Sequence, residues 1–275
     1  MNKEKSFLSW IKFGVLSIIL FLYIFPFLIV FINSFKDRKN ILLNPIELPS
    51  KLNFANYINA YTKMDYIHAF LNSLIITTFS VTLIILFSSM TAYIFVRRKW
   101  KFNQFMFFFM VASMIIPFQG IMIPLVKIYG SIGMMNSKWA LIYMYIGFGA
   151  SLAVFMYHGF IKSIPIELEE AATIDGCSQF QTFSKIVFPL LKPVTTTIAI
   201  LDILWIWNDF LLPYLVLLAP DQRTLPLSVF YFYGTYTIEF GPAMAALMLA
   251  TIPVIIVYII LQRQIIEGVL KGSIK

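Results

Sequence analysis

The sequence predicts an all-α integral membrane protein with six transmembrane helices. The chain of 275 residues is 60% hydrophobic and only 12% charged, with a mean hydropathy of +0.83, far from the values of ordinary soluble domains. Its longest uncharged stretches exceed the length that a helix needs to cross a bilayer. Its basic residues gather beside alternate stretches, as expected for a membrane topology. These three observations together predict the fold class.

Five uncharged stretches are each longer than the ~20 residues of a spanning helix. A sixth stretch is apolar apart from Asp202, Asn208 and Asp209, and we count it as a span that contains polar residues. The sequence therefore predicts transmembrane helices at about 11–34, 70–96, 103–126, 139–161, 193–219 and 240–262.

The positive-inside rule orients these helices. The cluster RRKWK at 97–101 is the firmest anchor, and placing it inside puts the larger share of the 21 lysines and arginines inside as well. Both termini and a polar segment, residues 162–192, are then cytoplasmic. The expected organisation is an N-terminal helix with its outer loop (1–66), a five-helix core (67–263) and a cytoplasmic tail (264–275). The first apolar run lacks a cleavage site and is expected to remain as a helix.

Several function classes do not fit the residues. The net charge of +8 follows membrane topology, and no segment interleaves basic and aromatic residues, so nucleic-acid binding is not expected. The single cysteine, Cys177, excludes an intramolecular disulfide. His68 and His158 stand apart from other ligand-type residues, so no metal site and no cofactor are expected. The sequence lacks the phosphate loop GxxxxGK[ST] and a nucleophile with its base, so we expect no enzyme and no ATP site of the usual phosphate-loop kind.

The third predicted span contains two prolines in the run MIIPFQGIMIP. Proline frees backbone groups that protein or water must then satisfy, because lipid cannot. Pro117 and Gln119 therefore indicate either a broken helix beside a cavity or a kink tolerated by neighbouring helices.

The polar segment 162–192 is predicted to fold as a helix, a glycine turn and a second helix. Ser163 is placed to cap the first helix, whose early turns carry Pro165 and three glutamates, and that helix should end at Gly176. Ser178 with Gln181 fits a capping box that starts the second helix, which Pro189 should stop.

The faces of these two short helices suggest a contact with another protein. Leu168, Ala171, Ala172 and Asp175 share one face of the first helix, and Phe180, Phe183 and Val187 share one face of the second. Small residues beside a leucine allow close approach, and the acids could accept from a partner's arginines. The alternative is an amphipathic loop at the membrane surface.

The spacing of this segment resembles the coupling loop of type I permeases of binding-protein-dependent ABC importers. The resemblance covers nearly the whole chain and is nearest to the six-helix permease of maltose-type, carbohydrate-uptake systems. Its motifs are LNFANY, FLNSLIIT, MIIPFQGIMIPL, the run GSIGMMNSKWALI, IPIELEEAATIDG, WNDFLLP and the tail GVLKGSIK. One departure is Phe188, which stands where the family has leucine before the proline.

The resemblance implies an ABC permease core in which the polar segment contacts an ATPase subunit. Glu170, Ala171, Ala172 and Gly176 match the residues that enter the ATPase cleft, and Glu169, Asp175, Ile186 and Pro189 belong to the same motif. The implied partners are a second permease subunit, expected to be a different chain, two cytoplasmic ATP-binding subunits and an extracytoplasmic solute-binding protein. The implied location is the bacterial cell membrane, with sugar as the solute.

The fifth predicted span offers candidate residues for a translocation pathway. Asp202 and Asp209 are seven residues apart and should lie near one stripe of the helix, and ionisable groups in a span usually face protein or water. With Trp205 and Asn208 they would suit sugar hydroxyls, although interhelical hydrogen bonding would explain them equally well. Pro117 and Gln119 are the other pathway candidates.

A different class, an ion-gradient-driven secondary transporter, would use Asp202 and Asp209 as proton or cation sites. That class predicts repeats or matched broken helices in two halves, and neither is visible in the sequence. Which sugar is carried, and which permease contacts it, does not follow from the residues.

Overall fold

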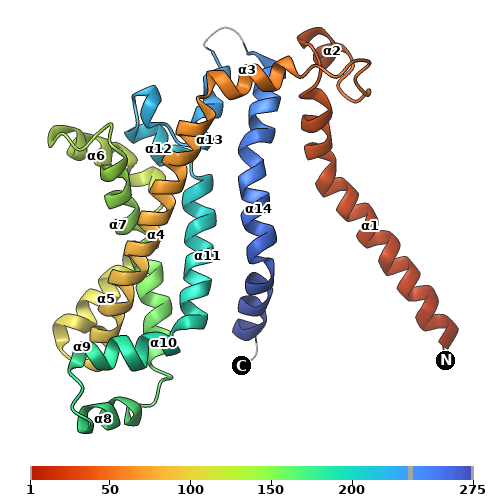
Figure 1. Cartoon of the computed structure of the whole chain (residues 1–275). Helices are drawn as coiled ribbons and strands as arrows, with labels where there is room; N and C mark the ends of the chain where they lie inside the picture. Colours follow the sequence, from red (N-terminus) through yellow and green to blue (C-terminus); the bar gives the residue numbers. More distant parts are fainter. Residues whose placement is uncertain (1, 235–237, 274–275) are drawn as a thin grey trace. The chain divides into compact units, whose positions relative to one another are not determined.

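The computed structural model describes residues 2–234 and 238–273, with side chains described for 9–234 and 238–263, and it confirms the all-α class. Within these ranges the only β pairing is one isolated bridge, Tyr233 to Ile238 (Figure 1). The α-helices are α1 Asn2–Asn33, α2 Arg38–Leu43, α3 Ala55–Lys63, α4 Tyr66–Arg97, α5 Lys101–Ser113, α6 Phe118–Ser131, α7 Lys138–Ile161, α8 Glu167–Ile174, α9 Gln179–Thr182, α10 Phe188–Leu190, α11 Lys192–Asn208, α12 Leu211–Val216, α13 Leu225–Val229 and α14 Phe240–Ser273. The π-helix η1 is Phe183–Val187, and the 3-10 helices are η2 Pro220–Gln222 and η3 Phe230–Phe232.

Four of these helices are long and apolar enough to cross a membrane as they stand. They are Ser9–Asn33 within α1, α4, α7 and Phe240–Arg263 within α14. Two further candidates are bent pairs: α5 with α6, bent by 106°, and Gln179–Leu190 with α11, bent by 74°. Five of the predicted spans correspond to the four single helices and the pair of α5 with α6, whereas the span predicted at 193–219 shares only α11 with the second pair. The side of the membrane on which the termini lie stays a prediction.

The span predicted at 103–126 is not one straight helix. The chain leaves α5 at Met114, and Pro117 stands before α6 in extended geometry (φ −68°, ψ 140°). Because a residue before proline avoids the α conformation and Pro117 has no N–H to donate, the helix ends here and restarts. Of the two alternatives, a broken helix and a tolerated kink, the structure has the break.

The span predicted at 193–219 also ends early. α11 stops at Asn208, and Asp209 is extended (φ −68°, ψ 132°). The Oδ1 atom of Asp209 accepts a hydrogen bond from the Leu211 N–H at 3.0 Å, a local bond that competes with continuation of the helix. Residues 211–216 then form the separate short helix α12.

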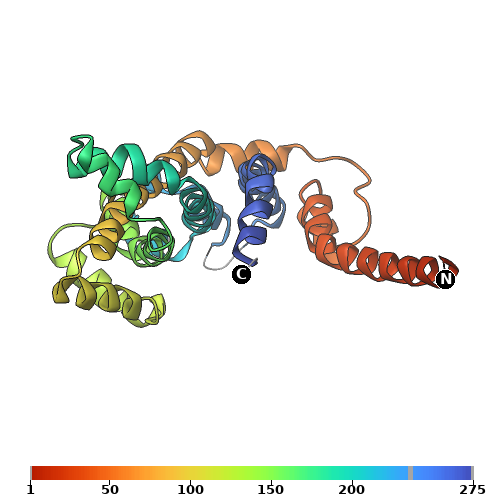
Figure 2. The same cartoon turned by 90° about the horizontal axis from the view of Figure 1, so that it is seen from below.

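The chain forms two compact units, 1–66 with 228–253 and 67–227 with 254–275. In the second unit α4, α7 and α11 pack around fully buried side chains that include Ile84, Leu141 and Tyr145. Gly149 lets these helices approach closely, since a Cβ there would lie 2.6 Å from Ile84 Cδ1 and 3.6 Å from the Trp205 ring. The segment α8 to α10 lies at one end of this unit and α12 at the other; Figure 2 views it from the α8 end.

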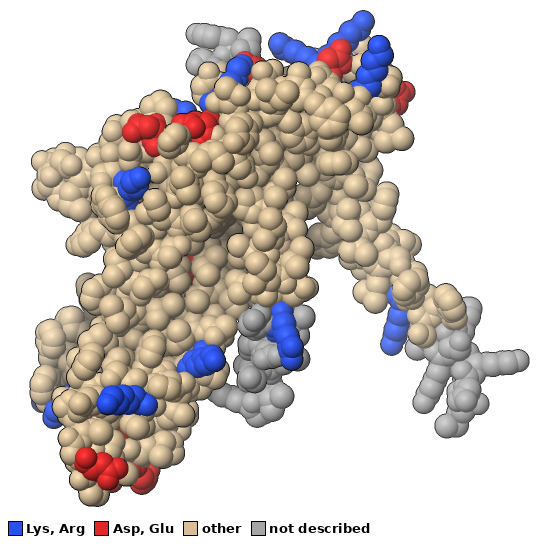
Figure 3. All heavy atoms as spheres, in the orientation of Figure 1, with Lys and Arg blue, Asp and Glu red and all other residues tan. Residues whose placement is uncertain are grey.

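Charged side chains of the second unit concentrate at these two ends. Figure 3 shows acidic atoms at the α8 tip, basic atoms on the side of them that is nearer the middle of the unit, and an almost uncharged surface between the ends. A protein whose middle lies in hydrocarbon is expected to have this distribution, because a charge at the bilayer centre costs several kcal/mol.

The first unit contains α1, the two short helices of the loop that follows it, and the start of α14. In the part of the chain that the structure describes, no residue of the most apolar stretch of α1 is buried. This is expected for a helix that faces lipid or another chain. Within this loop, α3 is a short amphipathic helix with Asn56 and Ala60 buried on one face. The Asn56 Nδ2 donates to the carbonyls of Ser34 (2.9 Å) and Lys36 (2.8 Å), which ties α3 to the end of α1.

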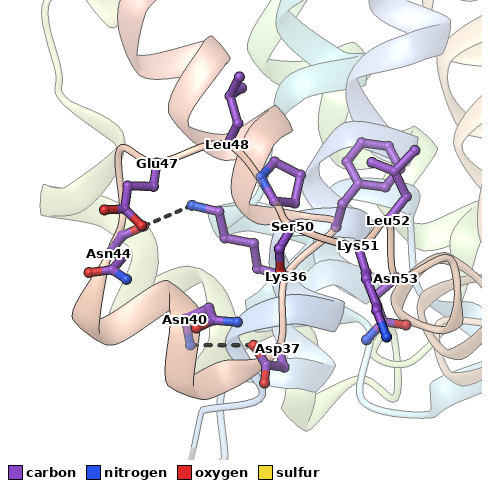
Figure 4. A pocket seen from close by; sticks show the side chains of 12 residues that line it. Lys36, Asp37, Asn40, Asn44, Glu47, Leu48, Ser50, Lys51, Leu52 and Asn53 are labelled. Carbon is purple, nitrogen blue, oxygen red and sulfur yellow. Dashed lines mark hydrogen bonds between the residues drawn. The ribbon is translucent and has the colours of Figure 1, made fainter.

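Lys36 is a buried cation in this loop (Figure 4). Its Nζ donates to the carbonyl oxygens of Asn44 (2.9 Å) and Pro45 (3.4 Å). Burial lowers the pKa of Lys36 below its usual range, and the nearby Glu47 carboxylate opposes that shift. The pocket around it, about 590 Å³, also exposes Asp37, whose side chain caps α2.

We expect Gly241→Ala to destabilise the first unit. A Cβ on Gly241 would lie 2.7–2.9 Å from the side-chain amide of Asn56, which its two hydrogen bonds hold in place. The expected loss is about 1–3 kcal/mol of unfolding free energy, seen as a lower melting temperature in detergent. Gly159→Ala is the control, because no heavy atom of a neighbour lies within 4 Å of its added Cβ. Equal melting temperatures for the two variants would contradict the expectation.

Candidate functional site

The polar segment 162–192 has the predicted glycine turn at its centre. α8 ends at Ile174, and Gly176 follows with φ +83°, a conformation that glycine adopts without a steric penalty. The Gly176 N–H donates to the Thr173 carbonyl (3.1 Å) and the Cys177 N–H to the Ala172 carbonyl (2.9 Å). These two bonds form a Schellman motif, which satisfies carbonyls that the end of a helix leaves open.

The predicted capping box at the start of the second helix is confirmed. The Ser178 hydroxyl accepts from the Gln181 N–H at 3.3 Å, and the Gln181 side chain accepts from the Ser178 N–H at 2.8 Å. Two N–H groups that would otherwise lack a partner are thus satisfied by two residues that lie three positions apart. The turn from α8 to α9 is therefore built from local interactions.

The prediction that Ser163 caps the first helix is wrong. The Ser163 hydroxyl donates to the Phe160 carbonyl at 2.7 Å, and its own N–H donates to the same carbonyl at 3.0 Å. Ser163 therefore belongs to the turn that follows α7. The residue before α8 is Ile166, which makes no side-chain cap.

Pro189 does not stop the second helix. The chain passes from α9 through the π-helix η1 into α10 and ends only at Leu190. Within η1 the Phe188 N–H bonds to Phe183, five residues back. In an α-helix a proline ring would clash with the carbonyl four residues earlier, and the wider π turn relieves that clash. The sharp bend comes at Leu191, before α11.

The two faces of the segment differ from those predicted. Glu169 and Ala172 are buried, whereas Glu170, Ala171, Asp175 and Gly176 are exposed. Ala172 therefore does not share a face with Ala171 and Asp175, contrary to the prediction. Phe183 and Val187 are core residues while Phe180 is exposed, so these three do not share a face. Ile186 is half-buried and Pro189 exposed.

The outward surface is both acidic and apolar. Glu170 and Asp175 lie beside three exposed apolar side chains on α8 and α9, of which Ile174 is 86% exposed. Several exposed apolar side chains next to carboxylates suit the face of a helix that is covered by a partner. The others are Leu168 and Phe180.

Glu169 faces into the protein, where three donors meet its carboxylate. Arg97 reaches Oε1 with both Nε and Nη2 at 2.7 Å, and the Tyr93 hydroxyl donates to Oε2 at 2.8 Å. The same Arg97 Nη2 donates to the Ile164 carbonyl at 3.1 Å. Sequence reasoning missed Tyr93 and assigned Arg97 to membrane topology only. The available signal was an acid at the inward position of an amphipathic helix, which requires a partner.

The pathway candidates on α11 do not form one stripe, because the helix ends before Asp209. Asp202 is buried (3% exposed), and its Oδ2 has no hydrogen-bond partner among the described residues. Trp205 is 41% exposed and Asn208 is exposed, and together with Leu201 they define a different face of α11. Among the predicted pathway residues of α11, Trp205 and Asn208 therefore share this exposed face, and Asp202 lies on a different, buried side of the helix.

Asp209 and Asn136 hold the short helix α12 at its two ends. The Tyr145 hydroxyl of α7 donates to Asp209 Oδ2 at 2.8 Å, while Oδ1 accepts from the Leu211 N–H. At the other end the Asn136 side chain accepts from the N–H groups of Leu218 (3.0 Å) and Ala219 (2.7 Å). Asn136 has a positive φ of 54°, which asparagine tolerates better than most residues.

A cavity of about 730 Å³ lies beside the break between α5 and α6, against α7. Apolar side chains dominate its lining, and Pro124 contributes to it. Pro117 and Gln119 are exposed but do not line it. The predicted cavity thus exists, but the two residues that pointed to it are not among its lining residues.

We expect Tyr145→Phe to loosen α12. Loss of the hydroxyl leaves Asp209 Oδ2 without this donor, at a cost of about 1–3 kcal/mol for a partly buried acceptor. Hydrogen exchange measured by mass spectrometry should become faster in residues 209–217. Tyr143→Phe, on the exposed side of the same helix, is the control. Unchanged exchange at 209–217 in Tyr145→Phe would refute the role of this hydrogen bond.

Comparison with known proteins gives consistent results. Residues 84–271 match the family described as "Binding-protein-dependent transport system inner membrane component". The chain is 45% identical over 254 residues to the "Probable starch degradation products transport system permease protein AmyC" of Thermoanaerobacterium thermosulfurigenes, covering 92% of each chain. It is 35% identical over 281 residues to the "Multiple sugar-binding transport system permease protein MsmG" of Streptococcus mutans, covering 100% of each.

The fold also matches a solved transporter. The chain superposes with a TM-score of 0.82 on a chain of a bacterial ABC transporter involved in alginate import, at 20% identity, covering 96% of this chain and 98% of the other. The chain therefore belongs to the family of binding-protein-dependent transport system inner membrane components and is the multi-pass permease subunit of an ABC importer.

Proposed function

We propose that this permease carries an oligosaccharide delivered by an extracytoplasmic binding protein. The observation that carries the proposal is 45% identity, over nearly the whole chain, to a permease named for starch degradation products. MsmG, named for multiple sugars, supports the same class of solute. Ion-gradient-driven transport is not proposed, because the family's members work with a binding protein and an ATPase.

The face formed by Trp205 and Asn208 is the part of the predicted pathway that suits a sugar best. An exposed indole ring offers an apolar platform for the C–H face of a sugar ring, and the neighbouring amide can accept and donate hydrogen bonds to hydroxyls. Asp202 and Asp209 are assigned to the support of this region, since the first is buried and the second holds α12. The exposed Pro117 and Gln119 remain candidates for the pathway at the break of α5 and α6.

We propose that the chain itself is not catalytic and that the exposed face of the polar segment contacts an ATP-hydrolysing subunit. Glu170, Ala171, Asp175 and Gly176 form this face, and the apolar Ile174 beside them would be covered in the contact. The residues Glu169, Ala172, Ile186 and Pro189 support the segment from behind or beside that face. The sequence contains no phosphate loop, which supports an ATP-hydrolysing partner as the source of energy.

The assembly that follows contains this chain, a second and different permease, two cytoplasmic ATP-binding subunits and a solute-binding protein. The family's description names dependence on a binding protein. We place the assembly in a bacterial cell membrane with the polar segment and both termini in the cytoplasm, since the basic cluster 97–101 lies at the α8 end of its unit.

Reconstitution of the complete complex in proteoliposomes tests the solute. Labelled maltotriose should accumulate only when ATP is inside the vesicles, on the ATPase side, and binding protein is outside. Alginate oligosaccharide, which is acidic, is the contrasting solute and should not accumulate. Uptake of maltotriose that follows an ion gradient without ATPase, or no uptake of any neutral oligosaccharide, would overturn the proposal.

Glu170→Lys and Gly176→Pro should uncouple ATP hydrolysis from uptake while the chain still inserts in the membrane. The first reverses the charge on the exposed face, and the second places proline at φ +83°, which its ring forbids. We expect maltotriose uptake to fall by about fivefold or more, as for the loss of a typical coupling free energy. Gln179→Ala, an exposed change in the same segment, is the control. Normal uptake with either variant would contradict the assignment.

A further inference from the structure

We propose that Arg97 and Tyr93 are positioning residues that lock the polar segment to α4, and that α4 transmits movements of this segment to the opposite end of its unit. The proposal rests on the proposed contact between the polar segment and an ATPase subunit. It adds the internal connection through which that contact would act.

At the Arg97 end of α4, the connection is the Glu169 carboxylate. Both oxygens of Glu169 are engaged, Oε1 by two nitrogens of Arg97 and Oε2 by the Tyr93 hydroxyl. Tyr93 and Arg97 are one helical turn apart on the last two turns of α4, so they present their donors on one face. Arg97 also donates a hydrogen bond to the carbonyl of Ile164, which lies between α7 and α8. One side chain of α4 thus holds both α8 and the linker before it.

Stability alone is a poor explanation for this arrangement. The ion pair is largely buried, with side-chain exposures of 14% for Arg97 and 9% for Glu169. Buried ion pairs often contribute no more stability than well-packed apolar residues of similar volume, because both charges must lose water. What a guanidinium and a carboxylate do provide is a fixed relative orientation, since several short hydrogen bonds must be met together.

A second contact couples the same turn of α4 to the rest of the segment. The Tyr93 ring packs on Phe183 of η1 with centroids 5.2 Å apart, and Phe183 packs on Phe188 at 5.9 Å. α8 and η1 are therefore both tied to Tyr93. Glu169 and Glu170 are neighbours on α8 that face different surroundings: Glu169 meets Tyr93 and Arg97, and Glu170 lies on the exposed face. A displacement of the exposed face must therefore move the contacts of Glu169 with Tyr93 and Arg97, which we call the Glu169 lock.

The far end of α4 holds the loop before α13. The Asn72 side chain donates to the carbonyls of Asp221 (2.8 Å) and Arg223 (3.1 Å), and the Ser73 hydroxyl accepts from the Leu225 N–H at 2.8 Å. Lys138 at the start of α7 donates to the Asn72 oxygen at 3.2 Å. A continuous helix of 32 residues, about 48 Å long, joins these contacts to the Glu169 lock. Figure 1 shows α4 running between the two ends.

The first test measures ATPase activity in the complete reconstituted complex. The variants are Arg97→Lys, Glu169→Gln and Tyr93→Phe, with Arg98→Gln as the matched control, because Arg98 is the exposed neighbour in the same basic cluster. We expect basal ATPase and co-purification of the ATPase subunits to persist. Stimulation by binding protein with maltotriose should fall by about fivefold or more in the three variants only.

A charge exchange, Arg97→Glu with Glu169→Arg, keeps the test decisive if a single variant does not assemble. Partial recovery of stimulation over either single change is expected, because the pair is restored with reversed partners. Two results would overturn the proposal: unchanged stimulation in the assembled variants, or loss of ATPase binding in parallel with loss of stimulation.

A second readout does not depend on the solute. Asp221→Cys in a Cys177→Ser background gives a single exposed thiol at the far end of α4. ATP binding to the complex should change its labelling rate, and Arg97→Lys or Glu169→Gln should abolish that change while Arg98→Gln keeps it. An ATP-dependent change that persists in the lock variants would refute transmission through α4. Failure of maltotriose to stimulate the wild type would refute the proposed solute and leave this readout valid.

Discussion

Backbone hydrogen bonding inside a bilayer is the constraint on which the rest of this structure depends. Lipid offers no donors or acceptors, so a spanning chain must satisfy its N–H and C=O groups within helices or against other protein groups. The two places where a predicted span departs from a straight helix meet this condition differently. Pro117 lacks the N–H that would otherwise be open, and Asp209 supplies its own carboxylate to the next turn, at Leu211.

The polar segment combines two roles on a single short helix. Its inward side carries Glu169, fully hydrogen-bonded to α4, and its outward side carries Glu170 beside exposed apolar residues. Adjacent residues on a helix point about 100° apart, so a run of acids in the first turn necessarily serves different surroundings. This explains why one glutamate of the motif belongs to the fold and the next is free to meet a partner.

Local features of the fold could be predicted from the sequence, and features that depend on distant partners could not. The Schellman turn at Gly176 and the capping box of Ser178 and Gln181 involve residues a few positions apart, and both were predictable. The assignment of Ser163 failed because its hydroxyl bonds back to the Phe160 carbonyl in the turn after α7, while α8 begins only at Glu167. The assignment of Pro189 failed because a π turn, which has no clear sequence signal, accommodates the ring.

The sequence by itself determined that the chain is helical, lies in a membrane, and carries the motif of a permease, because composition, charge distribution and spacing are properties of the chain alone. Only the tertiary structure decided which side of each helix is covered. Glu169 meets Arg97 across 72 positions, and Asp209 meets Tyr145 across 64. Such pairs depend on how α4, α7 and α11 pack, and helix packing depends on the shapes of many side chains at once, which no local pattern records.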